Sequence, residues 1–280
     1  FDVLSAEIVA KGGPQPHQII ISDSNSPGDF WQWLYTLIGH IHNQDDLSFD
    51  LTHGWRMQSL VFSVGINFIR RVRDVRIAAV YYGMFENGKS TNRIVNIVDF
   101  YAINEWADAI GRVVSMADTR KLAEMVSTAP GHQFGHLADP TLVDALKQLG
   151  LCLTNINVNQ VATVADQALA VVKERMVGAT QAERLLLESV IEAFDELAGK
   201  QGEQGYDATY YDLQQAIIKL LGKYGYYMQA FTVMRECIGS LGLTWVESTN
   251  DRKYAEILCN MLYYSQKKWR FNEDQKEYVE

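Results

Sequence analysis

The sequence predicts an α/β domain with an open, mostly parallel sheet, followed by an all-helical domain. In residues 17–125, short apolar runs typical of strands alternate with helix-like stretches, a pattern typical of βαβ units with right-handed crossovers. From Asp139 onward, apolar residues recur only at helical spacing. Glycine, proline and histidine are frequent in residues 127–140, which read as a linker. We therefore expect one domain over residues 1–130 and a second over residues 139–280.

Four runs in the first half read as strands, and they are residues 17–21, 47–51, 75–85 and 93–100. The third run is almost entirely apolar in its middle, as expected for a strand that is covered on both faces. The turn-forming segment NGKST precedes the fourth run. It allows the last two strands to form a hairpin instead, so the far edge of the sheet is either parallel or antiparallel.

Helices are expected between these strands, over residues 27–42 and 55–72. The first of them has a clear start, because Ser26 can cap the helix, Pro27 suits its first position and Asp29 favours its positive end. Residues 1–12 also read as a helix, and residues 100–126 as two helices that are interrupted near residues 116–118. In the second half, helices are expected over residues 140–151, 157–177, 180–199, 208–222, 224–241 and 251–268.

Composition and charge exclude several classes of protein. The chain of 280 residues is 48% hydrophobic and 21% charged, which is an ordinary globular balance. Its net charge of −9 disfavours a protein that wraps duplex nucleic acid, so an anionic ligand must be held by helix N-termini and single arginines. No apolar run is long enough to span a bilayer, and we expect no membrane partner. The three cysteines lack metal-ligand spacing, which favours a reducing cytoplasm and no bound metal.

The segment FDLTHGWR, residues 49–56, is the strongest candidate for a ligand site. A predicted strand ends at Asp50, and a polar turn then leads into the N-terminus of a helix. Ligands of open parallel sheets bind at the carboxyl ends of strands, where a helix N-terminus attracts phosphate. Gly54 allows close approach, Thr52 and His53 offer hydrogen bonds, and Arg56 supplies a positive charge. The alternative interpretation is a structural turn, capped by Thr52.

This segment, the strand that ends in YYGMFE, the following IVDF and the helix NEWADAI resemble the CARF domains of CRISPR-associated proteins. These motifs occupy residues 50–109 in order. The likeness is closest to the group whose CARF domain precedes a helical HEPN ribonuclease domain. It implies a Rossmann-like sensor that forms a homodimer, or a higher oligomer, around cyclic tetra- or hexa-adenylate. This activator would be bound without any cofactor, and the helical domain would then cut single-stranded RNA.

The resemblance also implies which residues would contact the ring. They are Ser22, Asn25, Asp50, Thr52, His53, Gly54, Arg56, Tyr82 and Gly83.

The chain departs from this family pattern in two ways. The family's first strand has no counterpart, because the chain starts with a predicted helix. In addition, HEPN ribonucleases use an arginine followed four to six residues later by a histidine, and all six histidines here precede residue 137 without that spacing. Catalytic residues therefore stay unassigned. Either a catalytic helix lies beyond Glu280 or the nuclease function is lost. Two further hypotheses stay open, which are a ring nuclease that cleaves its own ligand and a non-enzymatic sensor or adaptor.

Overall fold

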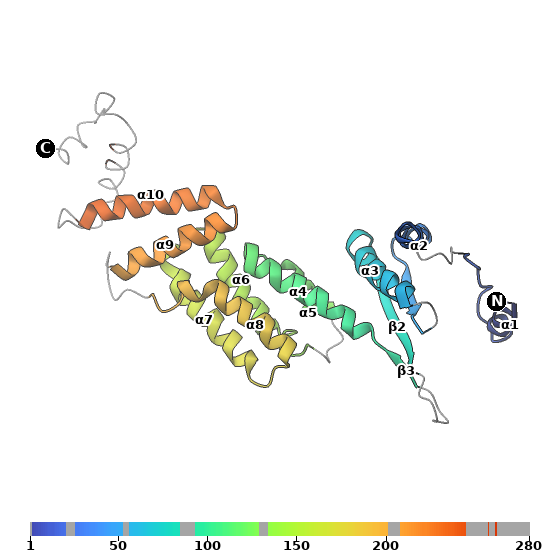
Figure 1. Ribbon diagram of the computed structural model, residues 1–280. Coiled ribbons are helices and arrows are strands. Elements are labelled where there is room, and N and C mark those ends of the chain that lie inside the picture. Colours follow the sequence, from blue (N-terminus) through green and yellow to red (C-terminus); the bar gives the residue numbers. More distant parts are fainter. Residues whose placement is uncertain are drawn as a thin grey trace. The chain divides into compact units, whose positions relative to one another are not determined.

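The computed structural model describes residues 2–20, 26–52, 56–84, 93–128, 134–200 and 208–244, together with Ile257 and Met261. The chain divides into two compact units, Phe1–Ala102 and Ile103–Glu280 (Figure 1). The first unit contains all the described strands, and the second is helical throughout its described part.

A small mixed sheet forms the centre of the first unit. It consists of β1 (Asp46–Asp50), β2 (Arg76–Met84) and β3 (Arg93–Asn96), in the order β1-β2-β3. The β1–β2 pair is parallel, and β2–β3 is an antiparallel hairpin in which Tyr82 faces Val95. The predicted strands over residues 47–51 and 75–85 are confirmed, and the far edge of the sheet is antiparallel.

Helices α2 (Pro27–Gly39) and α3 (Arg56–Val72) accompany this sheet, and α1 (Asp2–Ala10) precedes them. The capping residues proposed for α2 are confirmed, since the Ser26 side chain accepts a hydrogen bond from the Asp29 N–H and Pro27 occupies the first turn. One face of the sheet packs against α3, and Ile66 contributes to a buried apolar cluster with Leu51, Ile77, Val80 and Tyr101. Gly65 lets α3 approach α2, because a Cβ there would lie 2.9 Å from Leu34.

The prediction of an open, mostly parallel, Rossmann-like sheet is wrong. The described residues form three strands with one parallel pair, and helices dominate the structure. Residues 17–20 of the first predicted strand are irregular and exposed, with Ile20 at 86% exposure. The predicted strand over residues 93–100 ends at Asn96, because the Asn96 side chain accepts the Val98 N–H and α4 (Val98–Met116) begins there. A CARF domain is therefore not evident in this fold.

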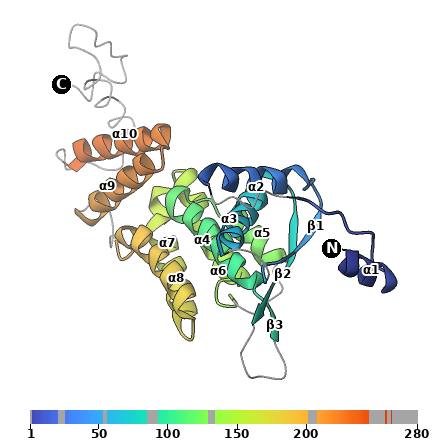
Figure 2. The same ribbon diagram turned by 45° about the vertical axis from the view of Figure 1, so that its right-hand side comes forward.

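The second unit is a helical array in which neighbours along the chain pack together. It contains most of α4, which starts in the first unit, followed by α5 (Arg120–Thr128), α6 (Pro140–Thr154), α7 (Val158–Met176), α8 (Gln181–Phe194), the 3₁₀ turn η1 (Asp195–Leu197), α9 (Ala208–Lys223) and α10 (Tyr227–Thr244). In both views α9 and α10 run side by side as a hairpin (Figure 2). The expected helices over residues 140–241 are confirmed.

Two buried or half-buried carboxylates fix helix starts in this unit. Asp139 caps α6, where its side chain accepts the Thr141 N–H and pairs with Arg175 at 2.9 Å. Glu183 is 1% exposed, and it accepts the Thr180 N–H at the start of α8 and the His136 N–H at 3.0 Å. Because both oxygens of Glu183 have donors, this buried charge is satisfied and its role is structural.

Candidate functional site

The carboxyl ends of β1 and β2 meet at one edge of the sheet and form the candidate site. Beyond β1, the Leu51 N–H donates to the Tyr81 carbonyl at 2.9 Å, which prolongs the parallel pairing. The next residue, Thr52, then accepts the Gly83 N–H on its hydroxyl at 2.7 Å. Two segments that were predicted to contact the same ligand, residues 50–56 and 82–83, are therefore joined by a direct hydrogen bond.

Gly83 is required for this close approach. A Cβ at Gly83 would lie 2.5 Å from the Thr52 methyl carbon, a distance that non-bonded carbon atoms do not adopt. Because glycine has no Cβ, the Thr52 side chain can approach the backbone of β2, as is common where a backbone comes close to another group. The residue type at position 83 thus follows directly from the packing.

Asp50 orders the turn at this edge. Its Oδ1 accepts the Thr52 N–H at 2.8 Å, and the side chain is exposed. An exposed carboxylate repels a phosphodiester, so its contribution to binding an anion is to shape the backbone that follows. Asp50 therefore orders the backbone of this turn, and its predicted contact with a ligand stays a prediction.

The remaining predicted contacts fall into two groups. Tyr82 is 45% exposed next to Gly83, so its ring is accessible to a ligand. The positions Ser22, Asn25, His53 and Gly54 lie outside the described residues. Arg56 is the first residue of α3, the place that was predicted for it, and its side chain is also outside the described set.

Two further residues at this edge were not predicted from the sequence. Tyr81 lies opposite Asp50 across the β1–β2 pair and is 40% exposed. Arg93 lies opposite Met84 across the hairpin, so an exposed cation stands at the carboxyl end of β2. The signal that could have identified Arg93 is the hairpin register, because an antiparallel partner begins where β2 ends.

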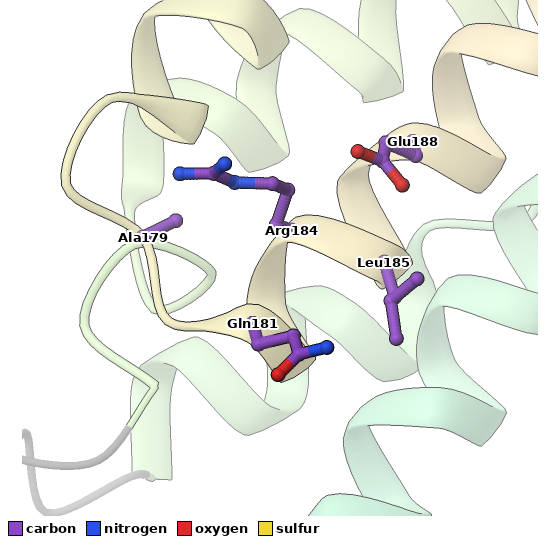
Figure 3. A pocket seen from close by; sticks show the side chains of 5 residues that line it. All are labelled: Ala179, Gln181, Arg184, Leu185 and Glu188. Carbon is purple, nitrogen blue, oxygen red and sulfur yellow. The ribbon is translucent and has the colours of Figure 1, made fainter.

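A separate pocket of about 450 Å³ lies in the helical unit at the start of α8. Its lining residues are Ala179, Gln181, Arg184, Leu185 and Glu188. In Figure 3 the Arg184 guanidinium extends toward Ala179, while Glu188 lies one helical turn further on. Leu185 is 60% exposed. The pocket combines one cation, one anion and one apolar side chain of a single helix, and none of the predicted contact residues lines it.

The described part of the chain shows no reactive thiol, no metal site and no membrane-spanning helix. Burial raises the pKa of the Cys152 and Cys237 thiols, which disfavours their reactive thiolate forms. The described residues contain no group of three or more His, Cys, Asp or Glu side chains placed to hold a metal ion. Among the same residues, none of the helices combines the length and the apolar character that crossing a membrane requires.

Comparison with known proteins shows a similarity over part of the chain. Over 73 residues, the chain is 27% identical to CRISPR-associated protein MJ1674 of Methanocaldococcus jannaschii. The matched segment is 25% of this chain and 12% of that protein, so the chain spans a small part of its relative's length. No protein-family model matches the sequence. The similarity supports an association with CRISPR systems and is silent on ligand, reaction and partners.

Proposed function

We propose that the chain is part of a CRISPR-associated protein and that its first unit binds cyclic oligoadenylate at the carboxyl ends of β1 and β2. The observation that carries this proposal is the hydrogen bond between the Gly83 N–H and the Thr52 hydroxyl, which brings two of the predicted contact segments together. The CRISPR-associated relative supports the biological setting. The proposal needs only β1, β2 and the first turn of α3, and does not depend on a Rossmann-like sheet.

The chemistry of this edge suits a small phosphodiester that carries adenine bases. Helix α3 begins at Arg56, and the free N–H groups of a first helical turn attract phosphate. The exposed cation of Arg93 adds a second positive charge. Tyr82 exposes an aromatic ring on which a base can stack, an interaction worth roughly 1–3 kcal/mol per base, while Tyr81 extends to the opposite face of β2. Together these groups offset the unfavourable net charge of the chain.

The helical unit would convert ligand binding into a response. Cleavage of single-stranded RNA by the whole protein is the response that the sequence resemblance implies, and it remains a proposal. Ligand binding can change the state of the helical unit only if the ligand binds one arrangement more tightly than the other. A tenfold change in activity needs about 1.4 kcal/mol of such differential binding.

Calorimetric titration of the full chain with cyclic tetra-adenylate and cyclic hexa-adenylate tests the binding site. We expect Arg56→Ala to weaken binding by about 1.5–3 kcal/mol, which is the usual loss of a charge-assisted hydrogen bond. Thr52→Val should also weaken it, because the Gly83 N–H loses its acceptor. Arg71→Ala, at the exposed far end of α3, and Thr232→Val, in α10, are matched controls with unchanged affinity.

The same samples separate the competing functions. Wild-type affinity in Arg56→Ala, or no binding of either ring to the wild type, would overturn the proposed site. Linear adenylate fragments in the titrated sample would instead identify a ring nuclease. If the ring binds intact and single-stranded RNA survives incubation with the complete protein, the chain belongs to a non-enzymatic sensor or adaptor.

A further inference from the structure

Helix α3 carries a ridge of apolar side chains that its own unit leaves exposed. The sheet covers one side of α3 at Ile66, and α2 covers another at Gly65. On the remaining side, four large apolar side chains are 45–58% exposed and recur at every fourth position, at Leu60, Val64, Phe68 and Val72. These four residues form the α3 ridge, which extends over about 18 Å. Apart from Arg71, every exposed position in residues 59–72 belongs to this ridge. A continuous apolar surface of this kind marks a contact region.

The spacing of the α3 ridge suits packing against an identical helix. Side chains four residues apart form the ridges that interlock when two helices cross at about −50°, the commonest packing of helices in globular proteins. In a two-fold contact between identical chains, the same surface serves both copies. With the axis midway between Val64 and Phe68, Val64 of each copy meets Phe68 of the other. Leu60 then meets Val72, so every residue of the α3 ridge has an apolar partner.

The charges of α3 favour an antiparallel crossing of the two helices. Arg70 and Arg71 lie in the last turn of α3, and Arg73 follows its end. A parallel crossing would gather these cations of both copies at one end of the contact, where like charges repel. An antiparallel crossing separates Arg71 of the two copies by about 15 Å along the contact, which exceeds the Debye length of about 8 Å in physiological salt.

We propose that α3 is a self-association surface, at which two copies of this chain pack their α3 ridges together in an antiparallel crossing. The contact needs no ligand and uses none of the candidate site residues, because α3 begins at Arg56, about 15 Å from the centre of the ridge. A standard dimer interface buries roughly 800 Å² on each copy, more than four half-exposed side chains supply. The dissociation constant is therefore on the order of 10–100 μM, and the ridge stays exposed in more dilute solution.

Analytical ultracentrifugation of the full chain, without cyclic oligoadenylate, tests this contact. The wild type should pass from monomer to dimer between about 5 and 500 μM. Val64→Glu and Phe68→Lys each place a charge in the α3 ridge, and each should weaken association roughly tenfold or more. Their circular dichroism should stay unchanged, since both side chains lie at the surface. The matched control is Leu185→Glu, which should dimerise like the wild type because Leu185 is 60% exposed in α8.

The double variant Val64→Glu with Phe68→Lys tests the orientation of the two helices. In the antiparallel crossing, the new carboxylate of each copy faces the new ammonium group of the other, so association should recover by about threefold or more over either single variant. No recovery would overturn the antiparallel crossing. A wild type that stays monomeric at 500 μM would overturn the self-association surface, as would a dimer that Val64→Glu leaves at its original affinity. Because no ring is present, these outcomes do not depend on the proposed ligand site.

Discussion

Helix α6 of the helical unit and helix α3 of the sheet-containing unit differ in how far their surroundings cover their apolar side chains. In the helical unit, α6 alone buries Leu142, Leu146, Leu149 and Leu153 to 2% exposure or less. In the first unit, α3 buries Ile66 and Ile69 completely, yet it leaves Leu60, Val64, Phe68 and Val72 45–58% exposed, one on each successive turn. The first unit therefore has more apolar surface than its described elements cover.

This difference follows from how each unit is connected. In the helical unit α6 packs against α7, α7 against α8 and α9 against α10, so many contacts are local in sequence. A parallel strand pair instead needs a crossover helix, and α3 covers only one face of a three-stranded sheet. A unit with a small core and exposed apolar side chains is the one in which we expect ligand or partner contacts.

Truncating one leucine in each unit gives the largest expected effect. Leu149→Ala in α6 should lower the free energy of unfolding by about 2–5 kcal/mol, because Leu149 is fully buried and its removal leaves a cavity. Leu60→Ala in α3 should change it by less than about 0.5 kcal/mol, since Leu60 is 56% exposed and both residues favour helices. Urea unfolding followed by circular dichroism measures both variants.

The outcome for Leu60→Ala decides the comparison between the units. If Leu60→Ala lowered the free energy of unfolding by more than about 1 kcal/mol, the exposed apolar side of α3 would be covered in solution. The contrast between the two units would then be wrong. A loss for Leu149→Ala as small as that for Leu60→Ala would show that the core around α6 is not tightly packed.

Local signals in the sequence predicted the helices well. Ser26 caps α2 and Pro27 lies in its first turn, as expected, because a cap depends on a few adjacent residues. Strands were predicted less well. The apolar run at residues 17–20 has the composition of a strand, but a strand also needs a hydrogen-bonded neighbour, and among the described strands β1 pairs with β2 alone.

The candidate site was predictable only where it follows from the chain direction of parallel strands. Thr52 and Gly83 come together because β1 and β2 are parallel, which the alternation of strands and helices indicated. Arg93 was missed because its position depends on the antiparallel register of β3, which the sequence left open. The hydrogen bond by which Asp50 accepts the Thr52 N–H was also not predicted from the sequence.

Two glycine substitutions in the helical unit test how tightly its elements pack. A Cβ at Gly150 in α6 would lie 2.6 Å from the carbonyl oxygen of Ala117, a backbone atom in the turn that follows α4. Gly150→Ala should therefore destabilise the protein by about 1–3 kcal/mol. Gly111→Ala in α4 meets no atom within 4 Å and should stabilise it by about 0.5–1 kcal/mol. Thermal unfolding measures both variants, and a Gly150→Ala protein as stable as Gly111→Ala would contradict the close packing.

The smallest expected effect concerns two ion pairs, one in each unit. At the turn after α4, the Asp118 carboxylate accepts hydrogen bonds from the Arg120 side chain at 2.9 and 2.8 Å. This contact lowers the pKa of Asp118 to about 2. In the first unit, Arg76 likewise lowers the pKa of Asp46, but both side chains are more than half exposed.

A lowered carboxylate pKa stabilises the folded state above the ordinary pKa, and this contribution disappears as the pH falls from about 4 toward 2. Asp118→Asn should therefore cost about 1 kcal/mol at pH 7, a value reduced because water surrounds Arg120, and little near pH 2, where the folded carboxyl is about half protonated. Asp46→Asn should change stability less, because water screens that pair. Urea unfolding at pH 7, 4 and 2 compares the two variants. If both variants lost the same free energy of unfolding at pH 7, the turn after α4 would be as open to solvent as the edge of the sheet. The difference in packing between the units would then not extend to their ion pairs.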